Sequence, residues 1–173
     1  MIKKNNKASY GGLMAKRNGE RFEHLLDVMC AQYRSRGLAC IQKTPEPMKP
    51  IRAINRNKGL YQAVFTKKAQ PDYSGTLNNG KSIVFEAKHT DTSNLPCNRI
   101  NSAQVRDLNA HSKLGALTYI VISFSMKNFY VVPWKKWQEL LKSTGKKSLN
   151  QKDLVEFEIS TKNGLLNLLE DIS

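Results

Sequence analysis

A predicted β-hairpin in the middle of the chain constrains the fold more than any other feature. Ile83-Val84-Phe85 predicts one of its strands, because β-branched and aromatic residues suit a pleated, packed surface. Leu77-Asn78-Asn79-Gly80-Lys81 predicts the preceding turn, since glycine adopts a positive φ at little cost. If the three central residues of that turn form the loop, counting back along both arms places Asp72 opposite Glu86. The sequence therefore predicts that two carboxylates meet across a hairpin.

Lys88 joins these carboxylates on one face of the predicted hairpin, because residues two apart on a strand point to the same side. Adjacent carboxylates repel each other unless a cation lies between them, and Mg²⁺ favours oxygen ligands of this kind. A bound metal can polarise a phosphodiester, while Lys88 can stabilise charge at phosphorus or help to position the attacking water. The alternative is a surface hairpin in which Lys88 and Glu86 form an exposed ion pair worth less than ~1 kcal/mol.

The net charge of the chain indicates a polyanionic partner. Its 173 residues include 28 Lys and Arg against 14 Asp and Glu, which gives a formal net charge of +14 and a pI near 9.8. Such a charge repels itself, so nucleic acid is the first candidate partner and an anionic membrane the second. No apolar run approaches the ~20 residues of a membrane span and no signal-peptide core follows Met1, so we expect a cytoplasmic protein that does not bind membranes.

The chain is expected to form a single domain over residues 19–173, preceded by a basic arm. Residues 1–18 contain no acid and predict a flexible arm, which either contacts DNA through residues such as Lys16 and Arg17 or is a solubilising tail. Residues 19–36 carry apolar side chains at helical spacing and predict an amphipathic helix that Gly37 ends. Glu23 borders the apolar stripe of this helix.

Residues 45–69 predict a projecting arm. Between Ile51 and Ala69, apolar residues are interleaved with basic ones, which suits a hairpin that reaches into DNA while packing against another surface. An ordinary long surface hairpin is the alternative. The basic residues of this segment are Arg52, Arg56, Lys58, Lys67 and Lys68.

The second half of the chain predicts a helix, two strands and two further helices. Asn101 or Ser102 can cap a helix that carries Gln104 in its first turn. The continuous apolar run Leu117–Phe124 is typical of a central strand covered on both faces, and residues 128–132 are its expected partner. Helices are expected after Pro133 and, from the spacing of leucines, over residues 164–172.

Several short sequence motifs along the chain resemble those of the RecU-type Holliday-junction resolvases of Gram-positive bacteria and their phages, within the PD-(D/E)xK nuclease superfamily. Pro71-Asp72 followed by Glu86-Ala87-Lys88 resembles the superfamily motif. The motifs that restrict the resemblance from the superfamily to the RecU-type resolvases occur in the order found in that family, between about residues 19 and 132. They are Gly19-x-x-Phe22-Glu23, Lys43-Thr44-Pro45-Glu46-Pro47, Asp72-Tyr73-Ser74-Gly75, Phe85-Glu86-Ala87-Lys88 and Gln104.

This resemblance implies an α/β fold of the restriction-endonuclease type, in which a mixed sheet is flanked by helices and a basic stalk projects from it. It implies a homodimer that resolves four-way DNA junctions by paired symmetric cleavage with Mg²⁺ or Mn²⁺, and a recombinase as a further partner. Two identical active sites also suit two symmetric nicks across a two-fold junction. If a phage encodes the protein, the cytoplasm is that of its host.

The same resemblance implies the residues of the site. The expected metal ligands are Asp72, Glu86, the backbone carbonyl of Ala87 and Glu23 as a third acid. Lys88 and Gln104 complete the expected catalytic group, with Gln104 arranging the attacking water. Of the expected DNA contacts the resemblance implies Lys43, whereas charge and position in the sequence suggest the others, which are Lys16, Arg17, Arg52, Arg56, Lys58, Lys67, Lys68 and His89. The alternative for Glu23, Lys43 and Gln104 is a solvated side chain without a role.

Two other functions fit the same residues. One is a phage or repair nuclease of the same fold that cuts duplex or flap DNA, for which a junction-reading arm is unnecessary. The other is a basic DNA-binding or recombination accessory protein without catalysis. The intact set of Asp72, Glu86 and Lys88 argues against the accessory protein.

Overall fold

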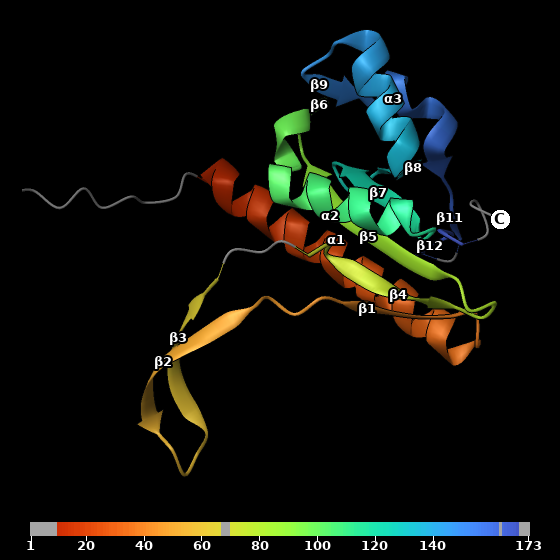
Figure 1. The fold of residues 1–173 in the computed structure, drawn as a ribbon. Helices are drawn as coiled ribbons and strands as arrows, with labels where there is room; N and C mark the ends of the chain where they lie inside the picture. The colour runs from red at the N-terminus through yellow and green to blue at the C-terminus, as the bar shows by residue number, and fades with distance from the viewer. Residues whose placement is uncertain (1–9, 67–69, 163, 170–173) are drawn as a thin grey trace, which may run out of the picture.

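The computed structural model describes residues 10–66, 70–162 and 164–169 (Figure 1). The first part of the chain forms α1 (Tyr10–Ser35), β1 (Ala39–Lys43), β2 (Met48–Asn55), β3 (Leu60–Phe65), β4 (Tyr73–Leu77), β5 (Ser82–Thr90) and β6 (Asn94–Pro96). The second part forms the 3-10 helix η1 (Cys97–Arg99), α2 (Ser102–Lys113), β7 (Leu117–Phe124), β8 (Asn128–Pro133), α3 (Trp134–Thr144), β9 (Ser148–Asn150), the 3-10 helix η2 (Gln151–Phe157), β10 (Glu158–Ile159), β11 (Thr161–Lys162) and β12 (Leu165–Leu166).

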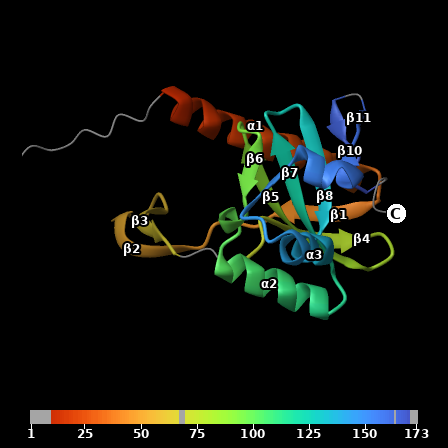
Figure 2. The same ribbon diagram turned by 90° about the horizontal axis from the view of Figure 1, so that it is seen from above.

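A six-stranded mixed sheet in the order β1-β4-β5-β7-β8-β10 forms the centre of the molecule. β5 and β7 run parallel, and every other neighbouring pair in this sheet is antiparallel. Seen from above, α1 lies on one side of the sheet and α2 on the other (Figure 2). The predicted mixed α/β sheet flanked by helices, with a projecting arm, is therefore confirmed.

The predicted central strand at residues 117–124 is confirmed, because β7 contributes to a core on each face of the sheet. Tyr119 and Val121 pack in the cluster beneath α1, which contains Phe22 and Leu26. The alternate residues of β7 pack in the cluster beneath α2 and α3, which contains Ile120, Ile122, Leu108, Trp134 and Trp137. This alternation explains why the strand is apolar throughout.

The predicted hairpin of β4 and β5 is confirmed in its register. Tyr73 pairs with Phe85, and the Leu77 N–H donates to the Lys81 carbonyl at 2.9 Å. Gly75 lets β4 approach β1, because a Cβ atom at this position would lie 2.2 Å from the Cys40 carbonyl oxygen. The close packing of β4 against β1 therefore requires the glycine of the motif Asp72-Tyr73-Ser74-Gly75.

The first helix is longer than predicted. α1 begins at Tyr10, whereas the sequence predicted a helix from about Gly19 and a flexible arm over residues 1–18. Residues 10–18 are thus helical, and residues 1–9 lie outside the described part of the chain. Once the packed segment around Phe22 and Leu26 has formed, each added residue gains a hydrogen bond. This gain outweighs the cost of about 1 kcal/mol for each of Gly11 and Gly12.

The helix predicted over residues 164–172 is wrong for the part that the structure describes, residues 164–169. There β12 pairs with β11 in a two-stranded antiparallel sheet. The Tyr33 hydroxyl of α1 donates to the Leu166 carbonyl at 3.3 Å and accepts from the Leu169 N–H at 3.1 Å. Short apolar runs have no decisive periodicity, and contacts with α1 decide this conformation.

The predicted arm is a separate β-hairpin of β2 and β3 that projects away from the main sheet (Figure 1). Every side chain in it is exposed except Ala53, which is half-buried. At its base the Thr66 N–H donates to the Pro47 carbonyl at 2.9 Å, so the two ends of the arm lie side by side. Among the described residues, no helix is long and apolar enough to cross a membrane.

Candidate active site

Asp72 and Glu86 lie opposite each other at the open end of the β4–β5 hairpin, as predicted. The Asp72 N–H donates to Glu86 Oε2 at 3.3 Å, and the Ala87 N–H donates to Asp72 Oδ2 at 3.1 Å. Each carboxylate is thus held by the backbone of the strand that carries the other. The hairpin register therefore fixes the orientation of both carboxylates as well as their proximity.

Lys88 reaches both carboxylates from the same face of β5. Its Nζ contacts Glu86 Oε1 and lies 3.8 Å from Asp72 Oδ2. The side chain of Lys88 is 11% exposed and that of Glu86 is fully buried. The alternative of a solvated surface ion pair is therefore excluded, because these charges lie in a poorly hydrated site where electrostatic interactions are strong.

Gln104 is buried in the first turn of α2 and donates through Nε2 to Glu86 Oε1. Its Oε1 accepts from the Asn101 N–H at 3.0 Å, while the Asn101 side chain accepts from the Gln104 N–H at 3.0 Å. This reciprocal capping box fixes the amide, because a flipped amide would place its carbonyl against a carboxylate. Gln104 is therefore held as a hydrogen-bond donor to Glu86, and the alternative of an exposed glutamine is excluded.

A cavity of about 750 Å³ opens over these groups. It is lined by the first half of α1, by Asp72, by the second half of β5 and the two residues after it, and by Arg99 and Gln104. Lys16 and Arg99 bring positive charge to this cavity. Besides the two carboxylates of the site, Glu20, Glu23 and Asp91 also line it.

Burial and the neighbouring Asp72 carboxyl raise the pKa of Glu86 from 4.5 to about 8, although Lys88 opposes the shift. Burial disfavours a charged carboxylate, and the neighbouring Asp72 carboxylate disfavours a second negative charge, so Glu86 retains a proton near neutral pH. A divalent cation bound to both carboxylates would stabilise their charged forms and displace this proton.

We expect the free energy of unfolding of the metal-free protein to fall as the pH rises from about 5 to about 8. In this window the folded state holds a proton on the Asp72–Glu86 pair that the unfolded state has released, because the folded pKa is the higher one. The decrease should be on the order of a few kcal/mol. Urea unfolding in the presence of a chelator, at several pH values, measures it.

Glu86→Gln is the matched variant for this experiment, because glutamine fills the same space without a titrating carboxyl. It should remove most of the pH dependence. Identical pH profiles for the variant and the unmodified protein would contradict the raised pKa.

Glu23 does not join the two carboxylates in this structure, contrary to the expectation of a third acidic ligand. It lines the same cavity, but its Oε2 accepts from Lys43 Nζ at 2.5 Å, and both side chains are about half exposed. In the described residues, no three His, Cys, Asp or Glu side chains are grouped to hold a metal ion. Glu23 gains a facing ammonium on β1, whereas a third carboxylate beside Asp72 would add to an already negative site. Lys43, expected at DNA, is therefore engaged with Glu23.

The residues that do converge fit a divalent cation such as Mg²⁺ or Mn²⁺. Asp72 and Glu86 offer hard carboxylate oxygens, which these ions prefer. A cation bound there would offset the burial that raises the pKa of Glu86. Ala87 lines the cavity between Glu86 and Lys88, so its carbonyl stays a candidate third ligand.

His89 makes hydrogen bonds within the protein in this structure, whereas a contact with phosphate was expected from the sequence. Its Nδ1 lies 3.1 Å from Ser123 Oγ on β7 and its Nε2 lies 3.1 Å from Asp91 Oδ1. The same Asp91 oxygen accepts from Asn18 Nδ2 on α1 at 3.0 Å. The imidazole is only 6% exposed, so it connects β5, β7 and α1.

The other candidate DNA contacts that the structure describes lie on α1 and on the arm. Lys16 lies on the cavity wall, 3.9 Å from Glu20, and Arg17 lines a separate groove on α1. The remaining described candidates belong to the arm or its tip, and they are Arg52, Arg56 and Lys58. Lys67 and Lys68 lie outside the described residues.

Tyr73, for which the sequence indicated no role, connects the segment of Asp72 to α1. Its ring is fully buried and stacks on Phe85 with the ring centroids 4.7 Å apart. Its hydroxyl lies 2.8 Å from Asp27 Oδ1 and 3.1 Å from the Glu23 carbonyl oxygen. The tyrosine next to Asp72 was visible in the sequence, but its partner lies 46 residues away and only the fold brings them together.

Comparisons with known proteins agree with the resemblance in the sequence. "Holliday junction resolvase RecU" of Streptococcus gordonii is 29% identical over 120 residues, which are 66% of this chain and 60% of that protein. The protein of the same name from Geobacillus thermodenitrificans is 25% identical over 150 residues, which are 80% of this chain and 73% of that one. The chain thus spans about 60% of the length of the streptococcal relative.

The Holliday junction resolvase Hjc of Archaeoglobus fulgidus aligns with a TM-score of 0.48 and 15% identity over 79% of this chain and 91% of that one. The sequence profile described as "RecU: Recombination protein U" matches residues 17–173, which include both carboxylates of the site, Lys88 and Gln104. Because the match extends over nearly the whole sequence, this chain belongs to the RecU family.

Proposed function

We propose that this protein is a divalent-metal-dependent endonuclease that cuts four-way DNA junctions as a homodimer. The observation that carries the proposal is the convergence of Asp72, Glu86 and Lys88 in a cavity that Lys16 and Arg99 also line. The relatives from Streptococcus and Geobacillus are named as Holliday junction resolvases, which supports the four-way junction as the substrate.

The contacts of the site indicate what each residue does in cleavage. Asp72 and Glu86 present the oxygens that would hold Mg²⁺ or Mn²⁺, with the Ala87 carbonyl as a further ligand. Such an ion supplies Lewis-acid chemistry, which polarises a phosphodiester and makes water more acidic. Lys88 lies beside both carboxylates, where its ammonium can stabilise negative charge at phosphorus or orient water. Gln104 fixes the orientation of the Glu86 carboxylate.

The register of β2 and β3 gives the arm two different faces. Directly opposed residues share a face and consecutive residues alternate, so the pairing assigns each side chain. One face, the apolar face, consists of Met48, Pro50, Ala53, Tyr61, Ala63 and Phe65. The other, the polar face, consists of Lys49, Arg52, Asn55, Leu60, Gln62 and Val64.

Two register shifts in β2 keep the faces distinct. Ile51 and Ile54 have no partner in β3, and the pairing shifts by one residue at each of them. Without the shift at Ile51, strict alternation would turn Arg52 onto the apolar face. The shift at Ile51 therefore places Lys49 and Arg52 on the same face.

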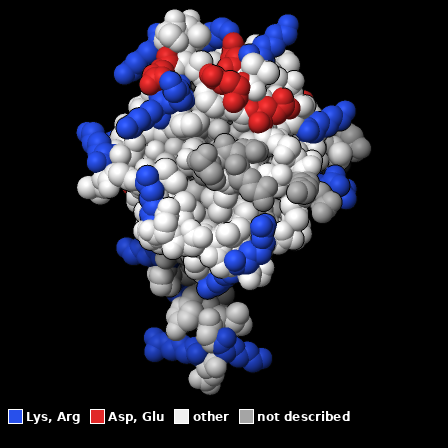
Figure 3. Space-filling model, turned by 90° about the vertical axis from the view of Figure 1, so that its right-hand side faces the viewer, with Lys and Arg blue, Asp and Glu red and all other residues white. Residues whose placement is uncertain are grey.

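No other element of the described chain packs over the apolar face. Tyr61 is 53% exposed and Phe65 is 69% exposed, although both are large apolar side chains. A contiguous exposed apolar surface of this kind marks a site of association. Figure 3 shows the arm below the body of the molecule, with Lys and Arg side chains near its tip. We infer that two arms pack through their apolar faces in the dimer, which leaves the polar faces and tips for the phosphates of the junction.

Phe65→Glu should therefore weaken the dimer. Losing the burial of one large aromatic side chain costs about 1.5–3 kcal/mol, which raises the dissociation constant of the dimer roughly 10- to 100-fold. Analytical ultracentrifugation over a range of protein concentrations measures this constant.

Val64→Glu is the matched control, because this neighbouring residue is also exposed and apolar but lies on the polar face. It should leave the dissociation constant nearly unchanged. An equal effect of the two substitutions would argue against an interface on the apolar face.

A cleavage assay with a synthetic four-way junction and a linear duplex of the same sequence, with and without Mg²⁺, tests the proposed function. Two symmetric nicks in the junction, dependent on Mg²⁺, are the expected result. Equal cleavage of the duplex would favour a duplex or flap nuclease. Binding without any cleavage would favour an accessory protein.

A further inference from the structure

Arg99 is one of the basic residues that line the active-site cavity. It ends η1 and is exposed to solvent. Its Nη2 donates to the backbone carbonyl of His89 at 3.4 Å, and no ion pair with an acid is found for it in the described part of the chain. A guanidinium has five N–H donors, so a single bond to a neutral carbonyl leaves its charge uncompensated.

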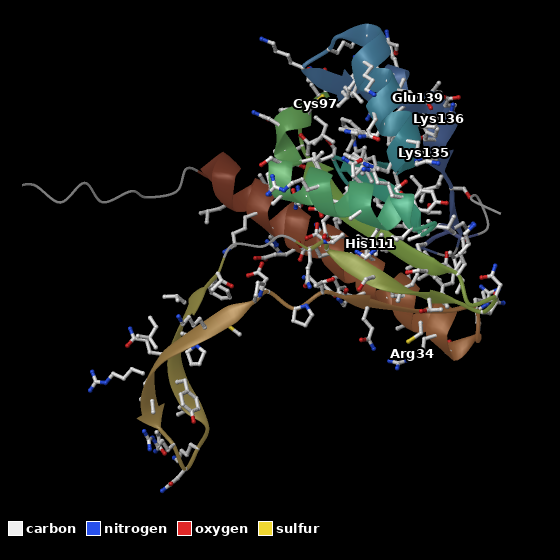
Figure 4. The ribbon with its side chains drawn as sticks, viewed as in Figure 1. Arg34, Cys97, His111, Lys135, Lys136 and Glu139 are labelled. Carbon is white, nitrogen blue, oxygen red and sulfur yellow. The ribbon has the colours of Figure 1, made fainter. Side chains whose placement is uncertain are left out.

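The backbone around Arg99 is held firmly on both sides. Leu95 and Ile100 are buried in the core beneath α2 and α3, and β6 pairs with β9. Asn101 then begins α2 with the capping box that fixes Gln104. Figure 4 marks Cys97, the first residue of η1, near the start of α2. A side chain on such a backbone is positioned in advance, at little cost in entropy on binding.

The hydrogen bond to the His89 carbonyl shows where the guanidinium lies along β5 relative to Glu86. His89 follows Glu86 by three residues, which is roughly 10 Å on a strand. Successive phosphates of one DNA strand are at least as far apart as their spacing of about 3.4 Å along the helix axis. Arg99 therefore lies at most about three nucleotides from a phosphodiester bound at Asp72 and Glu86.

We propose that Arg99 binds a second, uncleaved phosphate of the strand that is cut, and so determines which bond lies over Asp72 and Glu86. The N–H groups of a planar guanidinium match the oxygens of a phosphate, whereas Lys16, which lines the same cavity, shares its charge with Glu20 at 3.9 Å. The inference rests on the proposed function in one respect, since it requires a DNA strand in this cavity.

The first test is a binding measurement without cleavage. In an Asp72→Asn background, with a chelator and a synthetic four-way junction, Arg99→Gln should weaken binding about tenfold. The slope of log affinity against log salt should decrease in magnitude by about 0.9, the value for one phosphate contact. Arg99→Lys, which keeps the charge without the planar guanidinium, should restore the slope and only part of the affinity.

Arg34→Gln is the matched control, because it removes the same charge from an exposed residue. Figure 4 shows Arg34 at the other end of α1, and the 11 residues that separate it from Glu23 span about 16 Å of helix. This variant should leave both affinity and salt slope unchanged. Equal losses in Arg34→Gln and Arg99→Gln would mean that only net charge matters, which overturns the proposal.

The second test locates the phosphate. Neutral methylphosphonates are placed one at a time at the three phosphates on each side of the cleaved bond. At one of these positions, the methylphosphonate should lower the affinity of the protein with Arg99 about tenfold and leave the affinity of Arg99→Gln unchanged, because the variant has already lost that contact. If every methylphosphonate lowers the affinity of both proteins by the same factor, the inference is overturned.

Cleavage by the chain with an intact active site provides an independent readout. Arg99→Gln should distribute cuts over neighbouring bonds, while a purely structural role would lower the rate without moving the cuts. The binding tests do not depend on catalysis, so a failure of the unmodified protein to cleave with Mg²⁺ would count against the proposed function alone. A chain that binds no DNA would overturn both.

Discussion

Asp72→Asn is expected to reduce junction cleavage by at least about a thousandfold while changing junction affinity by less than about threefold. The substitution keeps an oxygen that can accept from the Ala87 N–H, so the hairpin should persist. It removes a charge that holds the cation, and several kcal/mol of transition-state stabilisation are lost, at 1.4 kcal/mol for each factor of ten. Binding depends on the basic surface and should remain. Single-turnover cleavage and fluorescence anisotropy measure the two quantities.

Glu86→Gln should behave in the same way, since its carboxylate is the buried half of the pair. Glu139→Gln is the matched control, because Glu139 is an exposed acid on α3 that pairs with Lys136 at 2.9 Å. Figure 4 labels both residues on that helix. The control should cleave at the normal rate. Cleavage retained by either active-site variant would mean that the catalytic site lies elsewhere.

Shortening the arm is expected to remove the preference for junctions and to spare the fold. Residues 48–65 can be replaced by Asn-Gly, because Pro47 and Thr66 are already joined by a hydrogen bond of 2.9 Å at the base of the arm. The arm forms its own two-stranded sheet, so its loss uncovers little of the main core. The open centre of a four-way junction is a shape that linear DNA lacks, and an arm can read it.

The measurement is the ratio of junction affinity to duplex affinity, which should fall at least about tenfold, toward one. A second variant, Arg52→Gln with Arg56→Gln and Lys58→Gln, separates charge from shape. It removes up to three phosphate contacts and should reduce the magnitude of the salt slope by up to about 2.7. A high ratio that survives the shortened arm would exclude junction reading by the arm. A ratio near one in the unmodified protein would favour a duplex nuclease.

The sequence by itself determined the parts of the site that depend on neighbours along the chain. The turn around Gly80 and the two-residue period of a strand were sufficient to place Asp72 opposite Glu86, with Lys88 on the same face. The unbroken apolar run of β7 likewise predicted a central strand. These predictions succeeded because a hairpin register and a strand period are local properties.

Only the tertiary structure decided how residues far apart in the chain meet at the site. Glu23 was expected beside Asp72, yet it pairs with Lys43 on β1, and His89 connects β7 and α1. Arg99 carried no signal in the sequence, and its place in the cavity follows from the packing of η1 and α2 on the sheet. Local patterns determine which face of an element is buried. Which side chains share a cavity depends on how α1 and α2 pack around the sheet, and that information is distributed over the whole core.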